Sequence, residues 1–250
     1  MAVSDAGREL TEAHQRAQRT LTGRALSRLA AAWAGVDIED PASWAGYIQT
    51  AEDLCGSAQS ESASVAGRYL ERFRRAELKA LGMPVERLAL TAPRFAMAGQ
   101  FESALAAFGP SYVRQLVTSG MPLEGAMRLA IAGQFGKAMG LILSPGRDVL
   151  AEGIQADRRC LGYRRVCSGG ACSFCAMLAT RGAVYKAHSF GVGSVKGVGR
   201  AEVHRSCQCS MEPVYSYSSK PTPDVRRFMA QWQAAGGDAT QFRRLVEGRA

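Results

Sequence analysis

The sequence has few aromatic residues and no long apolar run. Phe, Trp and Tyr make up 8% of the 250 residues, and alanine supplies much of the 47% apolar share. This composition favours helices over a sheet-dominated fold. Lys137 interrupts the most apolar stretch, residues 129–143, so no segment approaches the roughly eighteen apolar residues of a membrane span. The start of the chain also lacks the basic and then apolar pattern of a secretory signal, and we expect a soluble, unsecreted protein.

The net charge of +9 is unevenly distributed along the chain. Residues 147–210 contain 10 Lys and Arg against 4 Asp and Glu, whereas residues 1–146 contain 15 against 14. A basic segment of this kind attracts nucleic acid or an acidic protein surface, and charge alone does not distinguish the two. The residues that we expect to contact DNA phosphates, without reading bases, are Arg158, Arg159, Arg164, Arg165, Arg181, Lys186, Lys196, Arg200 and Arg205.

The spacing of apolar residues predicts two long helices followed by shorter ones. Residues 5–33 repeat apolar side chains every three or four positions, and Asp40 with Pro41 opens a second helix that ends before Gly82. These two segments predict an antiparallel helical hairpin. Turn residues at 109–110, 120–122 and 144–146 then predict small helices joined by tight turns, and a last helix over 221–245 is interrupted at 236–237.

The character of the sequence changes after Gly146. Glycine becomes frequent, helical periodicity fades beyond Asp157, and short strands are expected at 163–166 and 183–185. The glycine-rich loop at 191–199 does not have the spacing of a phosphate-binding loop. We therefore predict a mainly α protein with a helical domain (1–146), a small α+β, basic and zinc-binding domain (147–215) and a C-terminal helical tail (216–250).

Six of the seven cysteines lie between residues 160 and 209, and this clustering indicates a metal site. Cys172 and Cys175 have the spacing at which a tight turn directs two thiols to one ion, and His204 and Cys207 repeat it about thirty residues later. One structural zinc ion could then tie together a small domain.

The spacing does not determine which residue is the fourth ligand, or whether a metal ion is bound at all. Cys207 and Cys209 would point to opposite faces of an extended strand, so only one of them is expected to bind, and Cys167 is a further alternative. A reduced, metal-free cluster and a disulfide between the two segments are the other interpretations. The predicted metal ligands are Cys172, Cys175, His204, Cys207 and Cys209.

A catalytic role competes for the same side chains. Cys175 with His188 or His204 would make a cysteine hydrolase, in which Arg181 lowers the pKa of the thiol. A zinc nuclease would need a general-base histidine beside carboxylates, and only Glu202 is close in sequence. Neither signature is specific, and we expect a structural metal and a protein that is not an enzyme.

The segment from Gly146 to Tyr215 resembles the minor capsid and head-morphogenesis proteins of tailed phages, of the MuF-like type found in phages of actinobacteria. The resemblance rests on GR followed by Asp157, on RV before CSFCAMLATRG and VY, and on His204, Cys207 and Cys209 ahead of Glu212 and Pro213. Many of those proteins have a second histidine where this chain has Ser206.

The resemblance implies a virion protein that is encoded beside the portal and placed in few copies inside the head during assembly in the host cytoplasm. It implies portal or major capsid protein as partner, with packaged DNA as a further contact. Some members are labelled capsid maturation proteases, but Ser168 and Ser173 lack recognisable base and acid partners here. A capsid protease or nuclease, and a free-standing DNA-binding protein, are the alternative functions.

Overall fold

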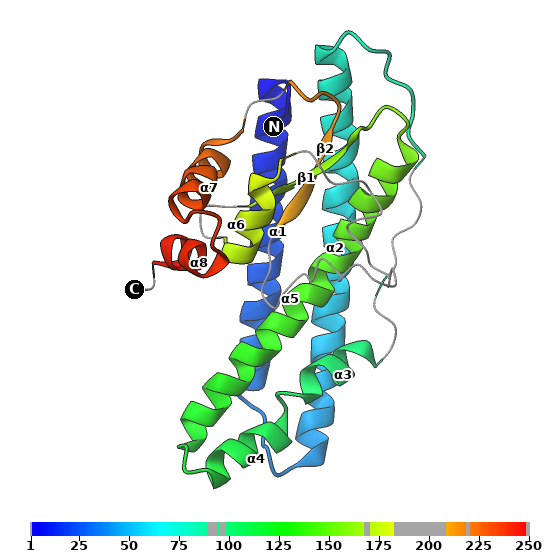
Figure 1. Cartoon of the computed structure of the whole chain (residues 1–250). Helices are drawn as coiled ribbons and strands as arrows, with labels where there is room; N and C mark the ends of the chain where they lie inside the picture. Colours follow the sequence, from blue (N-terminus) through cyan, green and yellow to red (C-terminus); the bar gives the residue numbers. More distant parts are fainter. Residues whose placement is uncertain are drawn as a thin grey trace, which may run out of the picture.

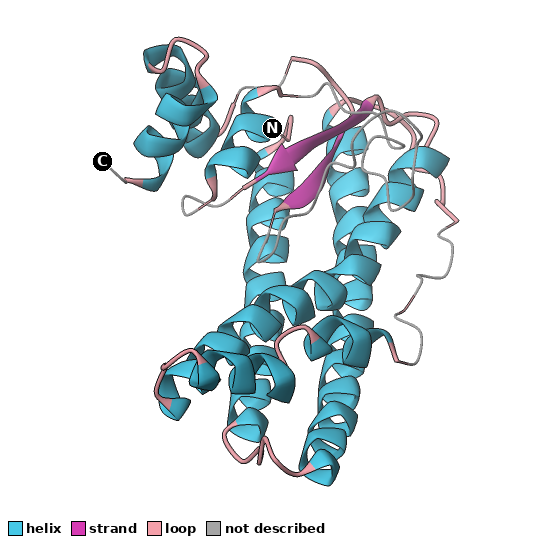
Figure 2. Ribbon diagram, turned by 60° about the horizontal axis from the view of Figure 1, so that its bottom comes forward, coloured by secondary structure: helices cyan, strands magenta, loops and turns pink. Residues whose placement is uncertain are grey.

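A computed structural model describes residues 2–89, 95, 99–167, 171–182, 209–218 and 221–248. Within these ranges the chain is mainly helical with one antiparallel pair of strands (Figures 1 and 2). The elements are α1 (Asp5–Trp33), α2 (Pro41–Ala80), α3 (Gln100–Ala106), α4 (Pro110–Thr118), α5 (Leu123–Ala156), β1 (Gly162–Val166), α6 (Ser173–Thr180), β2 (Ser210–Val214), α7 (Pro223–Ala234) and α8 (Ala239–Glu247). The predicted fold class is confirmed.

Helices α1 and α2 form the predicted antiparallel hairpin, and their first residues explain where each begins. Ser4 caps α1 by accepting the backbone N–H of Gly7, and Asp40 caps α2 by accepting those of Ala42 and Ser43. Each side chain satisfies N–H groups that have no partner within the helix. Helix α5 packs diagonally across both helices, while α3 and α4 close the end of the hairpin where α1 meets α2 (Figure 1).

Helix α5 contradicts the turn predicted at residues 144–146, because it continues unbroken through Pro145. Proline has no N–H, so the carbonyl of Leu141 loses its helical partner. The side chain of Gln59 on α2 donates to that carbonyl instead, at 2.9 Å. Beside it, Gly146 lets the helices approach so closely that a Cβ would lie 2.9 Å from the backbone oxygen of Ser62. Pro145 and Gly146, which in the sequence predict a break, thus lie where α5 crosses α2 closely.

The predicted division at residue 146 falls inside this helix, and the core continues across it. One cluster of buried side chains joins Tyr69 and Phe73 of α2, Leu150 of α5, Tyr163 of β1 and Met211 of β2. A second cluster fills the centre of the helical body, and a third lies between α6, α7 and α8. The two strands therefore pack directly on the helical body.

The strand predicted at 163–166 is confirmed as β1, and the interrupted last helix is confirmed as α7 and α8 with a turn at Gly236 and Gly237. The strand predicted at 183–185 lies outside the described residues. None of the helices in the described part has the length and apolar character needed to cross a bilayer.

Candidate functional site

The cysteine segments meet where β1 ends, α6 begins and β2 begins. Cys167, Cys175 and Cys209 are buried in one apolar cluster, and Cys172 packs against it. Phe228 of α7 and Phe242 of α8 cover this cluster. Residues from three separate segments of the sequence thus surround the same small volume.

Cys172 and Cys175 lie at the beginning of α6, and we call this pair of thiols the α6 knuckle. Cys172 is the N-cap residue, and its sulfur accepts the backbone N–H of Cys175 at 3.3 Å. The thiol of Cys167 donates to the carbonyl of Cys175, also at 3.3 Å. An N–H bond to sulfur at a helix N-terminus stabilises the thiolate, which is the form that binds a metal ion.

The described residues contain only part of the predicted ligand set. Cys172, Cys175 and Cys209 lie within the ranges that the structure describes, whereas His204 and Cys207 lie outside them. Within those ranges no group of three His, Cys, Asp or Glu side chains could hold a metal ion. A zinc site therefore stays a prediction that depends on His204 and Cys207 joining the α6 knuckle.

Arg164 and Arg165 of β1 are buried beside this cluster instead of facing solvent. Arg164 forms an ion pair with Glu212, its partner in the strand register, and Arg165 donates to the sulfur of Cys209 at 3.2 Å. Their exposed fractions are 9% and 1%. Both guanidinium groups are therefore too deeply buried in this conformation for the phosphate contact that we expected of them.

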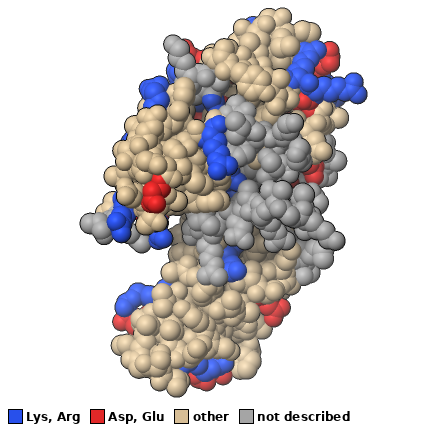
Figure 3. All heavy atoms as spheres, in the orientation of Figure 1, with Lys and Arg blue, Asp and Glu red and all other residues tan. Residues whose placement is uncertain are grey.

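The other predicted phosphate contacts have different environments. Arg158 and Arg181 are exposed, and Arg159 is held by Glu86 and by the carbonyl of Pro84. Figure 3 shows the described basic side chains scattered singly over the drawn face rather than gathered into one patch. The remaining expected contacts, Lys186, Lys196, Arg200 and Arg205, lie outside the described residues. Phosphate contact by Arg158 and Arg181 stays a prediction.

A buried polar cluster attaches β2 to the N-terminal helix. The hydroxyl of Thr11 donates to Glu212 at 2.7 Å and lies 2.9 Å from the hydroxyl of Tyr69. The ring of His14 stacks on Tyr69, with 4.4 Å between centroids, and its Nε2 lies 3.2 Å from the hydroxyl of Ser210. Burial lowers the pKa of His14 to about 4, so this imidazole is neutral in the folded protein at pH 7.

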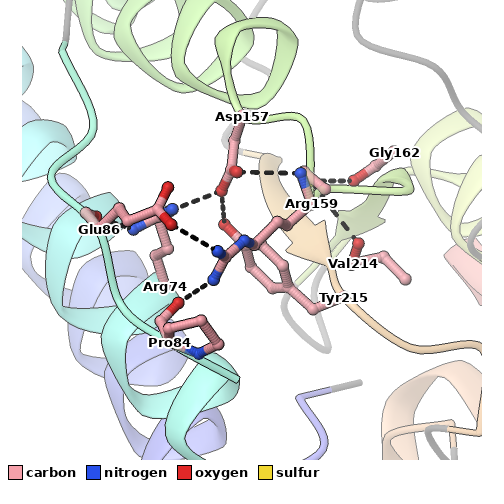
Figure 4. Close-up of polar contacts among 9 residues, drawn as sticks. Arg74, Pro84, Glu86, Asp157, Arg159, Gly162, Val214 and Tyr215 are labelled. Carbon is pink, nitrogen blue, oxygen red and sulfur yellow. Dashed lines mark hydrogen bonds and ion pairs between the residues drawn. The ribbon is translucent and has the colours of Figure 1, made fainter. Parts of the chain in front are cut away.

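Asp157 is the centre of a second buried polar cluster, which lies where α5 ends (Figure 4). Its carboxylate accepts Arg74 Nε at 2.6 Å, the hydroxyl of Tyr215 at 3.0 Å and the backbone N–H of Arg159 at 3.1 Å. Beside it, the Cys160 thiol donates to the carbonyl of Gly162 at 3.0 Å. Burial raises the pKa of the Cys160 thiol to about 11, which keeps the donor protonated. Through Asp157 this cluster joins α2 to the end of α5 and to Tyr215, the residue that follows β2.

The two buried polar clusters could not be found from local spacing, because their members are far apart along the chain. Thr11 and Glu212 are separated by 201 residues, and Arg74 and Asp157 by 83. No local spacing links such residues. The signal that could have been used is the presence of Thr11 and His14 on the apolar stripe of α1, where polar side chains need buried partners.

Comparison with known proteins covers both the helical body and the cysteine segments. The family model described as VG15 protein matches residues 6–235. The chain belongs to the VG15 protein family. The match begins in α1 and ends at the residue that follows α7, so it includes both the helical body and the strand pair and leaves out α8. No curated protein and no solved structure gives a match.

Proposed function

We propose that this protein is a structural and assembly component of a tailed-phage head, a minor capsid protein bound near the portal or the inner shell. The proposal starts from the resemblance of residues 146–215 to MuF-like head-morphogenesis proteins. The observation that carries it is the buried attachment of this segment to the helical body through Thr11 and Glu212, and through Arg74 and Asp157. The strand pair and the end of α5 are therefore a fixed part of one elongated body.

The environment of the described cysteines favours an architectural role over catalysis. Cys167, Cys175 and Cys209 are buried, and Cys172 accepts a backbone N–H. Arg165, the cation beside Cys209, is 1% exposed, so a substrate would have to displace packed side chains to reach that sulfur. The capsid protease and the zinc nuclease are accordingly second choices.

Assembly with the neighbouring phage gene products tests this proposal. The full chain is co-expressed with the portal and major capsid proteins encoded beside it, and heads are purified by sedimentation. We expect the chain to co-sediment in fewer copies than the major capsid protein, as quantitative mass spectrometry would show. A chain that stays at the top of the gradient, or that cleaves the capsid protein without entering the head, would overturn the proposal.

A single zinc ion is proposed to join the α6 knuckle to the segment before β2. Cys172 and Cys175 fit the donor chemistry, because thiolates are preferred zinc ligands and the Cys172 sulfur already accepts an N–H bond. His204 with either Cys207 or Cys209 would complete the tetrahedron. Zinc would supply a cross-link between two chain segments.

Metal analysis tests the zinc site independently of head assembly. We expect about one zinc ion per purified chain, and loss of that zinc together with the folding of α6 in Cys172→Ser. Cys55→Ser is the matched control, because Cys55 is buried in the helical body away from the other cysteines. Zinc-free protein that retains its structure and melting temperature would exclude the structural ion.

A further inference from the structure

A groove lies open between the beginning of α1 and the end of α2, which are side by side at one end of the molecule (Figure 1). It has a volume of about 600 Å³. Its floor is apolar and its rim is basic. The floor consists of Ala6, Leu10, Ala76 and Ala80, and the rim of Ser4, Arg72, Arg75 and Lys79.

The walls of this groove are held in place by Glu77. This buried carboxylate, 2% exposed, accepts the backbone N–H groups of Val3 and Ser4 and the hydroxyl of Ser4. Because unpaired N–H groups at a helix N-terminus attract a negative charge, Glu77 fastens the first turn of α1 to the last turns of α2. The groove therefore exists before any partner arrives, which lowers the entropic cost of binding.

Among the described residues, Arg75 is the one cation of the rim that has an ion-pair partner. Arg75 is paired with Glu71 at 3.1 Å, and both side chains are about two-thirds exposed. Arg72 and Lys79 form no ion pair among the described residues, and no acidic side chain lines the groove. A partner with carboxylates would meet three cations and displace at most one weak surface pair.

We propose that this groove binds an acidic amphipathic helix of a partner protein. Arg72 and Lys79 are seven residues apart on α2, which places them about 10.5 Å apart along the helix axis. A partner helix lying along α2 would match them with two carboxylates two turns apart. Its neighbouring apolar side chains would cover Leu10 and the three alanines, as in other helix-in-groove complexes.

The apolar floor argues for a protein helix rather than nucleic acid. A phosphate backbone would gain from the cations of the rim but would bury none of the apolar surface between them. An amphipathic helix uses both, so affinity would depend on the floor as well as on the charges. That the partner helix belongs to another phage-head protein rests on the assembly role proposed above. The groove itself is tested without a head.

Binding of a synthetic peptide to the full chain tests the groove. The probe is a labelled helical peptide of about 20 residues with a leucine stripe flanked by glutamates two turns apart, measured by fluorescence anisotropy. We expect affinity to fall about tenfold or more in the double variant Arg72→Glu, Lys79→Glu, because attraction becomes repulsion at both positions. The uncharged double variant Ala6→Gln, Ala80→Gln should also weaken binding, since it places polar bulk on the floor.

Two controls separate the groove from general charge attraction. The double variant Arg16→Glu, Arg28→Glu makes the same charge change at exposed positions of α1 outside the groove and should leave the affinity within about twofold. A peptide of the same composition without the leucine stripe should bind about tenfold more weakly.

The inference is overturned if the stripe-free peptide binds equally well, if both charge variants lose affinity equally, or if no peptide binds. Loss of duplex DNA binding alone in Arg72→Glu, Lys79→Glu would instead identify a nucleic-acid surface. None of these results bears on head assembly, which co-sedimentation tests separately.

Discussion

At the scale of single residues, the fold depends on buried polar side chains that have specific partners. His14 and Glu77 both lie on helices whose exposed faces are strongly charged, yet both are nearly inaccessible to solvent. Each is retained by specific partners, Ser210 and Tyr69 for His14 and the start of α1 for Glu77. Changes at such positions leave a partner group buried and unsatisfied, which costs more than the lost contact alone.

His14 predicts a loss of stability in mild acid. Its pKa of about 4 in the folded protein is below the ordinary value of 6.5, so the unfolded chain binds more protons between these two values. The free energy of unfolding should therefore fall as pH drops through this window, by about 3 kcal/mol between pH 7.5 and pH 4 from this residue. Urea unfolding of the wild type and His14→Gln at both pH values measures the difference. Equal losses in the two proteins would contradict the assignment.

Gly7 predicts a steric effect at the same end of α1. A Cβ at this position would overlap the Glu77 carboxylate and would lie 2.7 Å from the Cβ of Ala2. We expect Gly7→Ala to lower the free energy of unfolding by about 1–3 kcal/mol. Gly23→Ala on the same helix is the control: nothing lies within 4 Å of its Cβ, and alanine there should stabilise by roughly 0.5–1 kcal/mol. If Gly7→Ala were equally stabilising in chemical denaturation, the close contact with Glu77 would be wrong.

At the scale of helices and strands, the crossing of α2 and α5 depends on a missing helical hydrogen bond that a side chain of the other helix replaces. Pro145 removes one helical hydrogen bond, Gln59 replaces it, and Gly146 allows the backbones to meet. A proline that would end an isolated helix is tolerated because a neighbouring side chain satisfies the freed carbonyl. The continuity of α5 is thus a property of the pair of helices.

A double-mutant cycle measures this compensation. Gln59→Leu should lower the free energy of unfolding by about 1–3 kcal/mol, because it leaves the partly buried Leu141 carbonyl without a donor. In the Pro145→Ala background the helix supplies its own N–H, so the same substitution should cost at least about 1 kcal/mol less. Additive effects in thermal or urea unfolding would show that Gln59 does not substitute for the missing bond.

At the scale of the whole molecule, two buried polar clusters join the strand pair and the end of α5 to helices α1 and α2. Thr11 and His14 hold β2 from the N-terminal helix, and Asp157 joins Arg74 to Tyr215. Removing one partner of a buried ion pair leaves an uncompensated charge, whereas removing both can be nearly neutral. Stability of the strand pair on the helical body should depend on these clusters.

Asp157→Ala should lower the free energy of unfolding by about 3–5 kcal/mol. Adding Arg74→Met should recover part of that loss, since the buried guanidinium is then gone. Glu71→Ala breaks the exposed pair with Arg75 and should change stability by at most about 1 kcal/mol. Hydrogen exchange of residues 162–166 and 210–214 would report whether the strands detach first. A loss at Asp157 no larger than at Glu71 would contradict the importance of this cluster.

Much of the secondary structure could be predicted from the sequence, because it depends on local signals. Apolar spacing marks α1 and α2, Asp40 with Pro41 marks the start of α2, and the paired glycines mark the turn between α7 and α8. Helix α6 was not predicted, because its eight residues are too few for a clear apolar periodicity. Burial of Arg164 and Arg165 could not be predicted, since Glu212 and Cys209 reach them only through strand pairing and packing.

The sequence by itself determined the two long helices of the hairpin, the first strand and the interrupted helix near the end of the chain. These features follow from contacts between residues a few positions apart. Only the tertiary structure decided that α5 continues through Pro145, that two arginines of a basic segment are internal, and that α1 and α2 enclose a basic-rimmed groove. Each depends on a partner far away in the chain, and a buried polar group is stable only when folding brings that partner within hydrogen-bonding distance.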